Sequence, residues 1–144
     1  MIIRKMTIGD YEEAFEMWLQ AGESGIRTEE DSYEGIERFI ERNPDTSFIA
    51  EIDGRIVGVL MCGQDGRRGY IYHTAIRDPS RSRTIGKALL GAMSEAMNRL
   101  QIAKVGLLID GENDSGSVFW EQQGWIKRDD LMYFNRIIEN DIEK

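Results

Sequence analysis

The sequence predicts a mixed α/β (α+β) fold, in which a central, mostly antiparallel sheet of about seven strands carries helices on both faces. Three consecutive strand-like segments, at 47–52, 55–62 and 70–76, predict an antiparallel meander. A long helical stripe then leads into the apolar segment 104–109, which predicts a strand–helix–strand crossover. A meander joined to a crossover requires a mixed sheet with helices packed on it.

The first part of the chain predicts one strand and two helices. Residues 1–6 form a short apolar strand, and Thr7 and Asp10 have the spacing of a helix cap. The helix that follows has one apolar face, made of Tyr11, Ala14, Phe15, Trp18 and Leu19. A polar loop over 22–32 precedes a second helix over 32–43, whose apolar side holds Tyr33, Ile36 and Ile40.

Turn and helix signals divide the rest of the chain. Asp53-Gly54 is a two-residue hairpin signal between the first two strands of the meander. The long helix has an unbroken apolar stripe: Ile85, Ala88, Leu89, Ala92, Met93, Ala96, Met97 and Leu100. A shorter helix over 115–124 ends at Gly124, a good cap. Residues 124–129 and 131–138 are expected to close the sheet as strands, with 139–144 as a frayed tail.

Composition narrows the class of protein. The 144 residues suffice for one domain, and the net charge of −8 argues against nonspecific nucleic-acid binding. Cys62 is the single cysteine, which excludes an internal disulfide and fits a reducing cytoplasm. The start of the chain has no signal-peptide pattern, and the longest apolar run, 56–63, is far below the ~20 residues of a membrane span. We therefore expect a cytoplasmic protein that binds neither membranes nor nucleic acids.

A basic segment stands out against the acidic chain, with six basic residues and one acid, Asp78, between positions 67 and 87. Arg77, Arg81, Arg83 and Lys87 crowd the predicted start of the long helix, where the helix dipole normally disfavours cations. The free N–H groups of a helix start bind anions, and arginines add charged hydrogen bonds to phosphate. The segment predicts a polyphosphate site; the alternative is a solvated helix start whose arginines pair with acidic side chains.

Two segments carry a family resemblance. AIRDPSRSRTIGKALL, at 75–90, resembles the coenzyme A segment of the GNAT N-acetyltransferases, an Arg/Gln-x-x-Gly-x-Gly/Ala pattern after an apolar strand. Arg81 takes the first position and Gly86 the last, whereas Thr84 stands at the usual middle glycine. NDSGSVFWEQQGW, at 113–125, resembles the later family segment Asn-x-x-Ala-x-x-Leu/Phe-Tyr-x-x-x-Gly-Phe. The resemblance implies a GNAT fold and a single GNAT domain over 1–144.

The resemblance also implies transfer of an acetyl group from acetyl-CoA to a primary amine, by direct attack on the thioester. The acceptor is the amine of a small molecule, or the N-terminus or a lysine of a protein. The implied cofactor-binding residues are Thr74, Ala75 and Ile76 for pantetheine and the acetyl carbonyl; Arg81, Ser82, Arg83, Thr84, Ile85, Gly86 and Lys87 for the pyrophosphate; and Asn113, Phe119 and Trp120 for the cofactor arm. Many members have tyrosine where Trp120 lies, so Trp120 is either a packing residue or a cofactor contact.

The candidate catalytic residues lie on the strand over 70–76. Strand alternation puts Tyr70 and Tyr72 on one face, which in the family often looks toward the acceptor amine. The same alternation puts His73, the single histidine, on the opposite face in a structural role, unless a bulge reverses the phase. A phenol is a poor base at neutral pH, so the tyrosines are expected to order a water or line the pocket.

The acceptor side is marked by an acidic loop. Its acids, Glu23, Glu29, Glu30 and Asp31, would attract a cationic amine, and the candidate substrate-binding residues are Glu29, Glu30 and Tyr33; the alternative is a solvated cluster that caps the next helix. No metal site is expected, and a homodimer is compatible with the sequence. Two rival functions remain: a noncatalytic acyl-CoA-binding or regulatory module, favoured by Trp120, and a nucleic-acid patch at 67–87.

Overall fold

The structure is a computed structural model that describes residues 1–21, 29–77 and 82–138. The chain divides into two compact units, Met1–Asp110 and Gly111–Lys144. The predicted tail over 139–144 lies outside the described residues.

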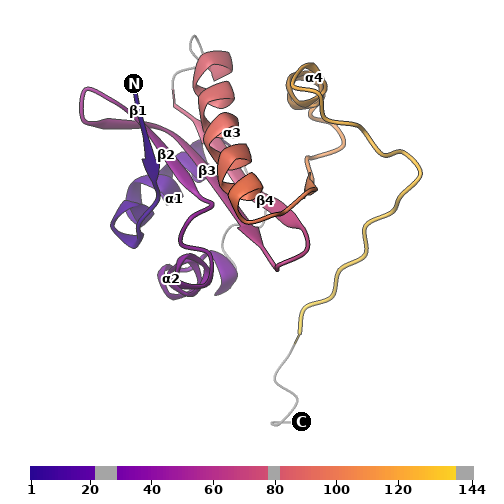
Figure 1. The fold of residues 1–144 in the computed structure, drawn as a ribbon, viewed down its shortest axis with the longest axis horizontal. Helices are drawn as coiled ribbons and strands as arrows, with labels where there is room; N and C mark the ends of the chain where they lie inside the picture. Colours follow the sequence, from indigo (N-terminus) through magenta and orange to yellow (C-terminus); the bar gives the residue numbers. More distant parts are fainter. Residues whose placement is uncertain (22–28, 78–81, 139–144) are drawn as a thin grey trace. The chain divides into compact units, whose positions relative to one another are not determined.

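The first unit is built on a five-stranded sheet with the order β1-β2-β3-β4-β5 (Figure 1). The strands are β1 (Ile2–Lys5), β2 (Phe48–Ile52), β3 (Arg55–Gln64), β4 (Gly69–Ile76) and β5 (Val105–Leu107). The first four pair antiparallel in succession, and β5 pairs parallel with β4. The mixed, mostly antiparallel sheet is therefore confirmed, although β5 is shorter than the predicted strand over 104–109.

Helices cover both faces of this sheet, as predicted. The helical elements of the first unit are η1 (Ile8–Asp10), α1 (Tyr11–Gln20), η2 (Glu29–Asp31), α2 (Tyr33–Arg42) and α3 (Ser82–Arg99). Helix α3 packs on β2 and β3, and α1 and α2 pack on the other face (Figure 1). In the described part of the chain, no helix is long and apolar enough to cross a membrane.

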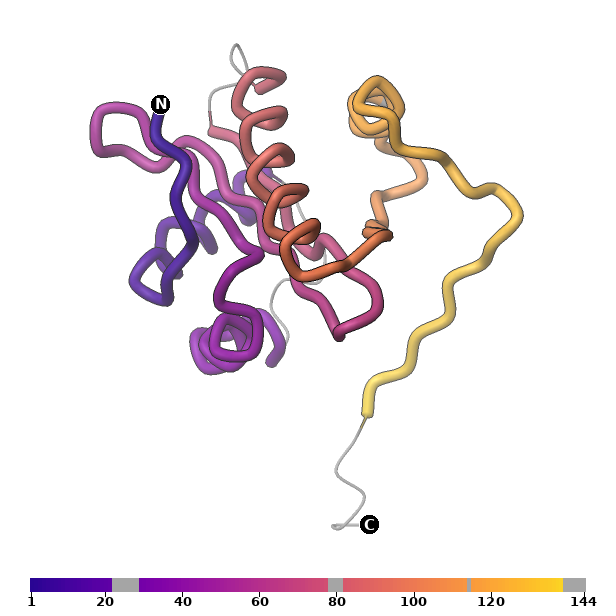
Figure 2. The backbone as a smooth tube through the Cα atoms, viewed as in Figure 1, coloured from indigo at the N-terminus to yellow at the C-terminus, as the bar shows by residue number. Residues whose placement is uncertain are grey.

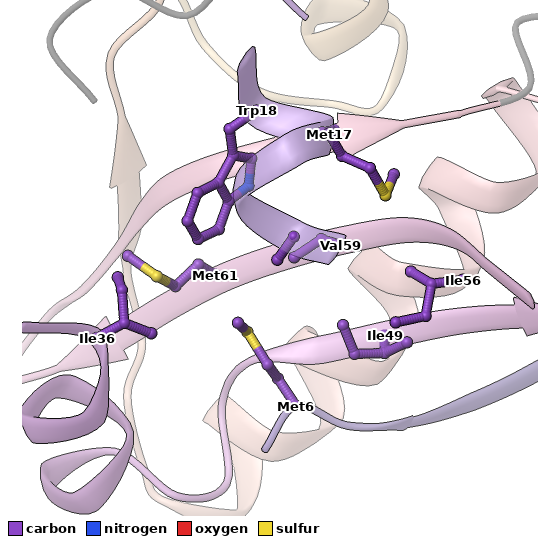
Figure 3. Packing of buried hydrophobic residues seen from close by; sticks show 10 residues of the cluster. Met6, Met17, Trp18, Ile36, Ile49, Ile56, Val59 and Met61 are labelled. Carbon is purple, nitrogen blue, oxygen red and sulfur yellow. The ribbon is translucent and has the colours of Figure 1, made fainter. Parts of the chain in front are cut away.

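The core beneath α1 and α2 is built from buried side chains of both helices and of three strands (Figure 3). Trp18 and Ile36 come from the helices and are fully buried, and they meet Ile49, Val59 and Met61 from the sheet. On the opposite face, Gly58 leaves room for α3: a Cβ there would lie 2.7 Å from the Ile85 side chain. Most residues of the predicted apolar faces of α1, α2 and α3 pack on the sheet. The prediction is wrong for Leu19, Tyr33 and Leu100, which are exposed, and it missed Met17, which is buried.

Local signals in the sequence correspond to local structure in the first unit. Asp53 (φ 52°) and Gly54 (φ 76°) form the tight turn between β2 and β3, because both central residues of such a turn need a positive φ. The backbone N–H of Thr7 donates to Asp10 at 2.9 Å, which confirms the predicted cap before α1. Ser32 caps α2 by accepting from the Gly35 N–H at 3.0 Å.

Asp10 links this helix start to the edge of the sheet. Its carboxylate accepts two hydrogen bonds from the Arg4 guanidinium, at 2.8 and 2.9 Å, and Arg4 also pairs with Glu51 on β2. Burial by itself would raise the pKa of Asp10, but the hydrogen bonds from Arg4 and Thr7 outweigh it and hold that pKa below its usual value. The ionised form of Asp10 therefore stabilises the fold.

We expect Asp10→Asn to lower the free energy of unfolding by about 1.5–3 kcal/mol at pH 7, because a charge-assisted pair is lost. Since the folded pKa is depressed, this stabilisation is present above the unfolded pKa of about 3.9 and disappears as the pH falls through the folded value. Urea unfolding of both proteins at pH 7 and pH 3 checks this. A difference that stays constant between the two pH values would contradict the assignment.

The second unit contains α4 (Asp114–Gln122) and a segment without regular secondary structure. Gly124 (φ 89°) ends the helix, as predicted. The predicted strands over 124–129 and 131–138 are wrong, because residues 123–138, which Figure 2 traces beyond the helix, pair with no strand of the described chain. A strand needs a neighbouring strand to which its backbone is hydrogen-bonded, and these residues belong to no such ladder. The sheet of the described residues therefore has five strands rather than about seven.

Candidate functional site

A bulge in β4 organises the candidate site. Met61 of β3 lies opposite His73, and Cys62 lies opposite Ile71, so Tyr72 is the extra residue of β4. An extra residue shifts the alternation of side chains by one position. Before the bulge, even-numbered residues face α1 and α2; after it, odd-numbered residues do.

The bulge corrects the prediction for His73. Its ring lies 4.4 Å from the ring of Trp18 on α1, so it occupies the face that Tyr70 and Tyr72 also occupy. The prediction that His73 lies on the opposite face is therefore wrong. The sequence does not reveal the bulge, because a bulge is defined by the register with β3 rather than by composition.

The two candidate catalytic tyrosines form an aromatic cluster with α2. The rings of Tyr70 and Tyr72 lie 4.8 Å apart, and Tyr72 meets the Phe39 ring edge-on at 5.4 Å. Tyr72 remains 51% exposed, so its hydroxyl-bearing ring is accessible at this surface. Gly63 of β3 allows this packing, since a Cβ there would lie 2.8 Å from the Phe39 ring.

The acidic loop reaches the same face of β4 through Asp31. The Asp31 carboxylate lies 2.7 Å from Nε2 of His73, and both side chains are nearly buried. Glu29 and Glu30, in the same helical turn η2, are exposed, and Tyr33 is half-exposed with its ring against Tyr11. Through Asp31, the described turn η2 thus lies beside β4, whereas Glu23 lies outside the described residues; the substrate-binding roles of Glu29, Glu30 and Tyr33 stay predictions.

Asp31 is one of the acids that the sequence places in this loop, but the sequence does not predict its inward position or its pairing with His73. It precedes the cap Ser32, but Glu29 and Glu30 share that polar context, and nothing in the order of residues distinguishes the acid that turns inward. Its burial follows from the contact with His73 and from the Tyr11 hydroxyl, which donates to the Asp31 carbonyl at 2.7 Å.

The residues assigned to pantetheine lie where β4 passes beyond β5. The β4–β5 ladder includes Gly69, Tyr70 and Ile71 only, whereas the ladder with β3 continues to Ile76. Thr74, Ala75 and Ile76 lie beyond the end of the β5 ladder. The Ala75 side chain is buried in the core under α1, so a cofactor contact at this position would use its backbone.

The start of α3 divides the pyrophosphate candidates into two groups. Ser82, Arg83, Thr84 and Lys87 are exposed, whereas Ile85 and Gly86 are buried against the sheet. Arg81 lies outside the described residues. Arg83 and Lys87, four residues apart, share one side of the helix near its N-terminus, where backbone N–H groups and basic side chains favour an anion.

Two details of the basic segment differ from a simple phosphate loop. Thr84 lies inside α3, and the positive-φ residues other than glycine in the described ranges are Asp53 and Gln101. Its position therefore does not need glycine. Arg77 points elsewhere: its Nε donates to the Ile56 carbonyl at 3.0 Å, which anchors the end of β4 to β3.

In the second unit, Asn113 acts as a helix cap. Its side chain accepts from the Gly116 N–H at 2.9 Å, and Gly116 permits this approach because a Cβ there would lie 2.5 Å from the amide of Asn113. Trp120 meets Phe119 and Trp125 edge-on, at 5.3 and 5.0 Å. Packing is thus one role of Trp120, and the cofactor roles of Asn113, Phe119 and Trp120 stay predictions.

Cys62 is not a candidate nucleophile. It lies on β3 with its side chain fully buried. Burial raises the pKa of its thiol to about 12. The reactive thiolate is therefore scarce at neutral pH, and Cys62 serves as a small apolar core residue.

Known proteins resemble this chain along nearly its whole length. The model of the Acetyltransferase (GNAT) family matches residues 11–125. An acetyltransferase of Sodalis glossinidius (strain morsitans) is 29% identical over 141 residues, which cover 97% of this chain and 98% of the relative.

Solved structures share the fold at low sequence identity. An aminoglycoside acetyltransferase from an uncultured soil metagenomic sample, in complex with sisomicin, matches with a TM-score of 0.75 at 18% identity and covers 96% of both chains. The ribosomal-protein-alanine N-acetyltransferase of Brucella melitensis biovar Abortus 2308 matches with a TM-score of 0.67 at 19% identity, over 95% of this chain and 100% of the other.

Proposed function

Because this chain belongs to the acetyltransferase (GNAT) family, we propose that it transfers an acetyl group from acetyl-CoA to a primary amine by direct attack on the thioester. The observation that carries the proposal is the course of β4. Its bulge turns Tyr72 and His73 to one face, its residues 74–76 continue beyond β5, and α3 begins after it with exposed basic side chains. These features supply an acceptor face, a backbone edge and an anion site along one segment.

The residues present fit acetyl-CoA as a co-substrate. Arg83 and Lys87 would bind the pyrophosphate together with the N–H groups of the first turn of α3, and Arg81 would add a third cation. The backbone of Thr74 to Ile76 would hold the pantetheine arm and orient the acetyl carbonyl. Acetyl-CoA supplies the activated thioester, and the chain supplies binding, orientation and proton transfer.

Proton transfer from the acceptor is the demanding step. A lysine-like ammonium has a pKa of about 10.4, so its deprotonation at neutral pH costs about 4–5 kcal/mol. Release of a thiolate with a pKa of about 8.5 costs about 2 kcal/mol. Assistance at the amine therefore matters more than an acid at the sulfur, and a tryptophan at position 120 in place of tyrosine is compatible with catalysis.

The acceptor belongs to one of two classes. The exposed Glu29 and Glu30 and the aromatic cluster of Tyr70, Tyr72 and Phe39 suit a cationic amine. One structural neighbour is an aminoglycoside acetyltransferase and another acetylates ribosomal protein alanine, by their names, so both a small polycationic amine and a protein N-terminus belong to the proposal. The proposal includes a cytoplasmic location.

An acetyl-transfer assay tests the proposal. The chain is incubated with acetyl-CoA and, separately, with a polyamine, an aminoglycoside, an alanine-terminal peptide and a lysine peptide. We expect amine-dependent release of coenzyme A thiol, with an acetylated product of one amine class detected by mass spectrometry. Coenzyme A binding without turnover on any amine would instead support a noncatalytic acyl-CoA-binding module, the alternative that Trp120 favours.

Tyr72→Phe is expected to lower kcat more than it changes the affinity for acetyl-CoA. Its ring is exposed on the acceptor face, and loss of the hydroxyl removes one hydrogen bond, worth about 0.5–1.5 kcal/mol or roughly a 2- to 12-fold change in rate. Steady-state kinetics with a responsive amine, together with calorimetric titration of coenzyme A, separates the two effects. Equal turnover in the variant would remove the hydroxyl from the mechanism.

A further inference from the structure

The single histidine of the chain is held in a nearly buried pair with a carboxylate. Nε2 of His73 lies 2.7 Å from Oδ1 of Asp31, and the two side chains are 12% and 7% exposed. The residues come from separate elements, β4 and η2, so the pair forms only in the folded chain. The family resemblance assigns no role to either position.

Contacts from α1 fix the geometry of both partners. The ring of Trp18, which is fully buried, lies 4.4 Å from the His73 ring with an angle of 31° between their planes. The Tyr11 hydroxyl donates to the Asp31 carbonyl at 2.7 Å and so fixes the backbone that presents the carboxylate. The imidazole is therefore oriented before any substrate binds.

The bulge sets this pair beside the candidate acceptor face. Tyr72, the extra residue, is directly followed by His73, and both side chains point to the side of the sheet covered by α1 and α2. Tyr72 is half-exposed, whereas His73 lies just beneath the surface. The Tyr72 ring and the imidazole therefore come from adjacent residues that share one face of the sheet.

The hydrogen bond also assigns the tautomer. A carboxylate oxygen accepts, so an ionised Asp31 selects the tautomer with hydrogen on Nε2 of His73, and in that neutral ring the lone pair lies on Nδ1. Burial and the negative charges of Asp31 and Glu34 raise the pKa of Tyr11, which therefore stays protonated at neutral pH. Tyr70 and Tyr72 on β4 and the exposed Glu30 on η2 are further titratable groups on the two elements that form the pair. Imidazole is the group among these with an ordinary pKa near neutrality.

We propose that His73, oriented by Asp31, receives the proton of the acceptor ammonium, an inference that rests on the proposed function. Nδ1 takes one proton from the ammonium, through the Tyr72 hydroxyl or a water. The neutral amine then forms the C–N bond while the C–S bond breaks. The departing thiolate takes the second amine proton, and the imidazolium returns its proton to water. Asp31 is a positioning residue in this scheme.

Because the chain has one histidine, NMR reports on His73 without ambiguity. In untagged protein, ¹⁵N-detected spectra of the ring should show the tautomer with hydrogen on Nε2. The acidic limb is the part of the pH profile in which kcat/KM rises with pH. The midpoint of the ring titration should coincide with the midpoint of this limb, measured with the amine that responds best in the acetyl-transfer assay. Midpoints that differ by more than about one pH unit would overturn the proposal, because the limb would then belong to another group.

Two variants and a matched control complete the test. His73→Gln is expected to lower kcat/KM about 100-fold at pH 7 and to remove the acidic limb, with unchanged coenzyme A affinity. Asp31→Asn should move the ring titration and the limb together to lower pH, because a nearby carboxylate favours the imidazolium. Asp10→Asn removes a charge-assisted pair with Arg4 that includes neither His73 nor Asp31, so it should reduce stability and leave the limb in place.

An active wild type in which His73→Gln keeps its rate and limb, or in which Asp10→Asn reproduces the His73→Gln profile, would overturn this inference and leave the proposed function intact. A wild type without transfer to any amine would refute the proposed function, and the inference with it. If His73→Gln does not fold, the NMR comparison and Asp31→Asn decide the question on the native ring.

Discussion

Trp18→Ala is expected to lower the free energy of unfolding by about 3–5 kcal/mol, the largest loss of stability that we expect from truncating one side chain. The Trp18 side chain is fully buried between α1 and the sheet, where it contacts the core under α1 and α2 and the His73 ring. Removing it leaves a cavity that the surrounding side chains fill only in part. Urea unfolding followed by far-UV circular dichroism measures the change.

Trp18→Phe is the control for this prediction. The indole Nε1 of Trp18 is buried and has no hydrogen-bond partner in the described part of the chain. A buried N–H without a partner costs about 1–3 kcal/mol, so phenylalanine loses packing area but also removes this penalty. We expect Trp18→Phe to be much less destabilising than Trp18→Ala. Equal losses would mean that the cavity is not the cause.

Arg83→Ala combined with Lys87→Ala is expected to weaken coenzyme A binding by about 1.5–3 kcal/mol for each charged hydrogen bond lost, roughly 10- to 100-fold each. Both residues are exposed on α3, whose buried Ile85 and Leu89 seat the helix over Gly58. Truncating the exposed basic side chains therefore leaves the packing of the helix unchanged. Isothermal titration with coenzyme A measures the affinity, and thermal unfolding checks the fold.

A matched double variant controls for the loss of positive charge. Arg67 and Arg68 are exposed in the turn before β4, with their backbone N–H groups on the Asp65 carboxylate. This turn precedes β4 (Gly69–Ile76) and the start of α3 follows it, so the two basic pairs belong to opposite ends of a strand ~23 Å long. Arg67→Ala with Arg68→Ala should leave the affinity within about twofold in 0.15 M salt, because screening limits long-range effects. Equal weakening in both double variants would refute the phosphate assignment.

Most of the fold could be predicted from the sequence because the signals that specify it are local. The Asp53-Gly54 turn, the Thr7–Asp10 cap and the stripe that includes Ile85 and Leu89 each depend on residues a few positions apart. The family resemblance, now confirmed by the family match over 11–125, depends on two such segments. Long-range strand pairing could not be predicted in this way. The bulge at Tyr72 and the absence of strands over 124–138 both depend on which other segment pairs with the backbone, and the composition of a segment does not show its partner.

In the candidate site, too, features that depend on neighbouring residues could be predicted from the sequence, and those that depend on long-range pairing could not. Exposed basic residues at the start of α3 follow from a helix pattern and a charge count. The pairing of His73 with Asp31 does not, since the two residues are 42 positions apart and strand alternation without the bulge turns His73 the wrong way. The cofactor and substrate assignments stay predictions, to be decided by measured binding and turnover.

The buried state of Cys62 makes the chain convenient for site-selective chemistry. Maleimides and iodoacetamides react with thiolates that they can reach, and this thiol is fully buried with a pKa of about 12. A cysteine introduced on the surface, for example by Glu95→Cys on α3 or by Asp65→Cys in the β3–β4 turn, can therefore carry a fluorophore while the native cysteine remains in place. Two such singly labelled proteins would report by fluorescence on α3 and on the β3–β4 turn without altering the proposed cofactor residues.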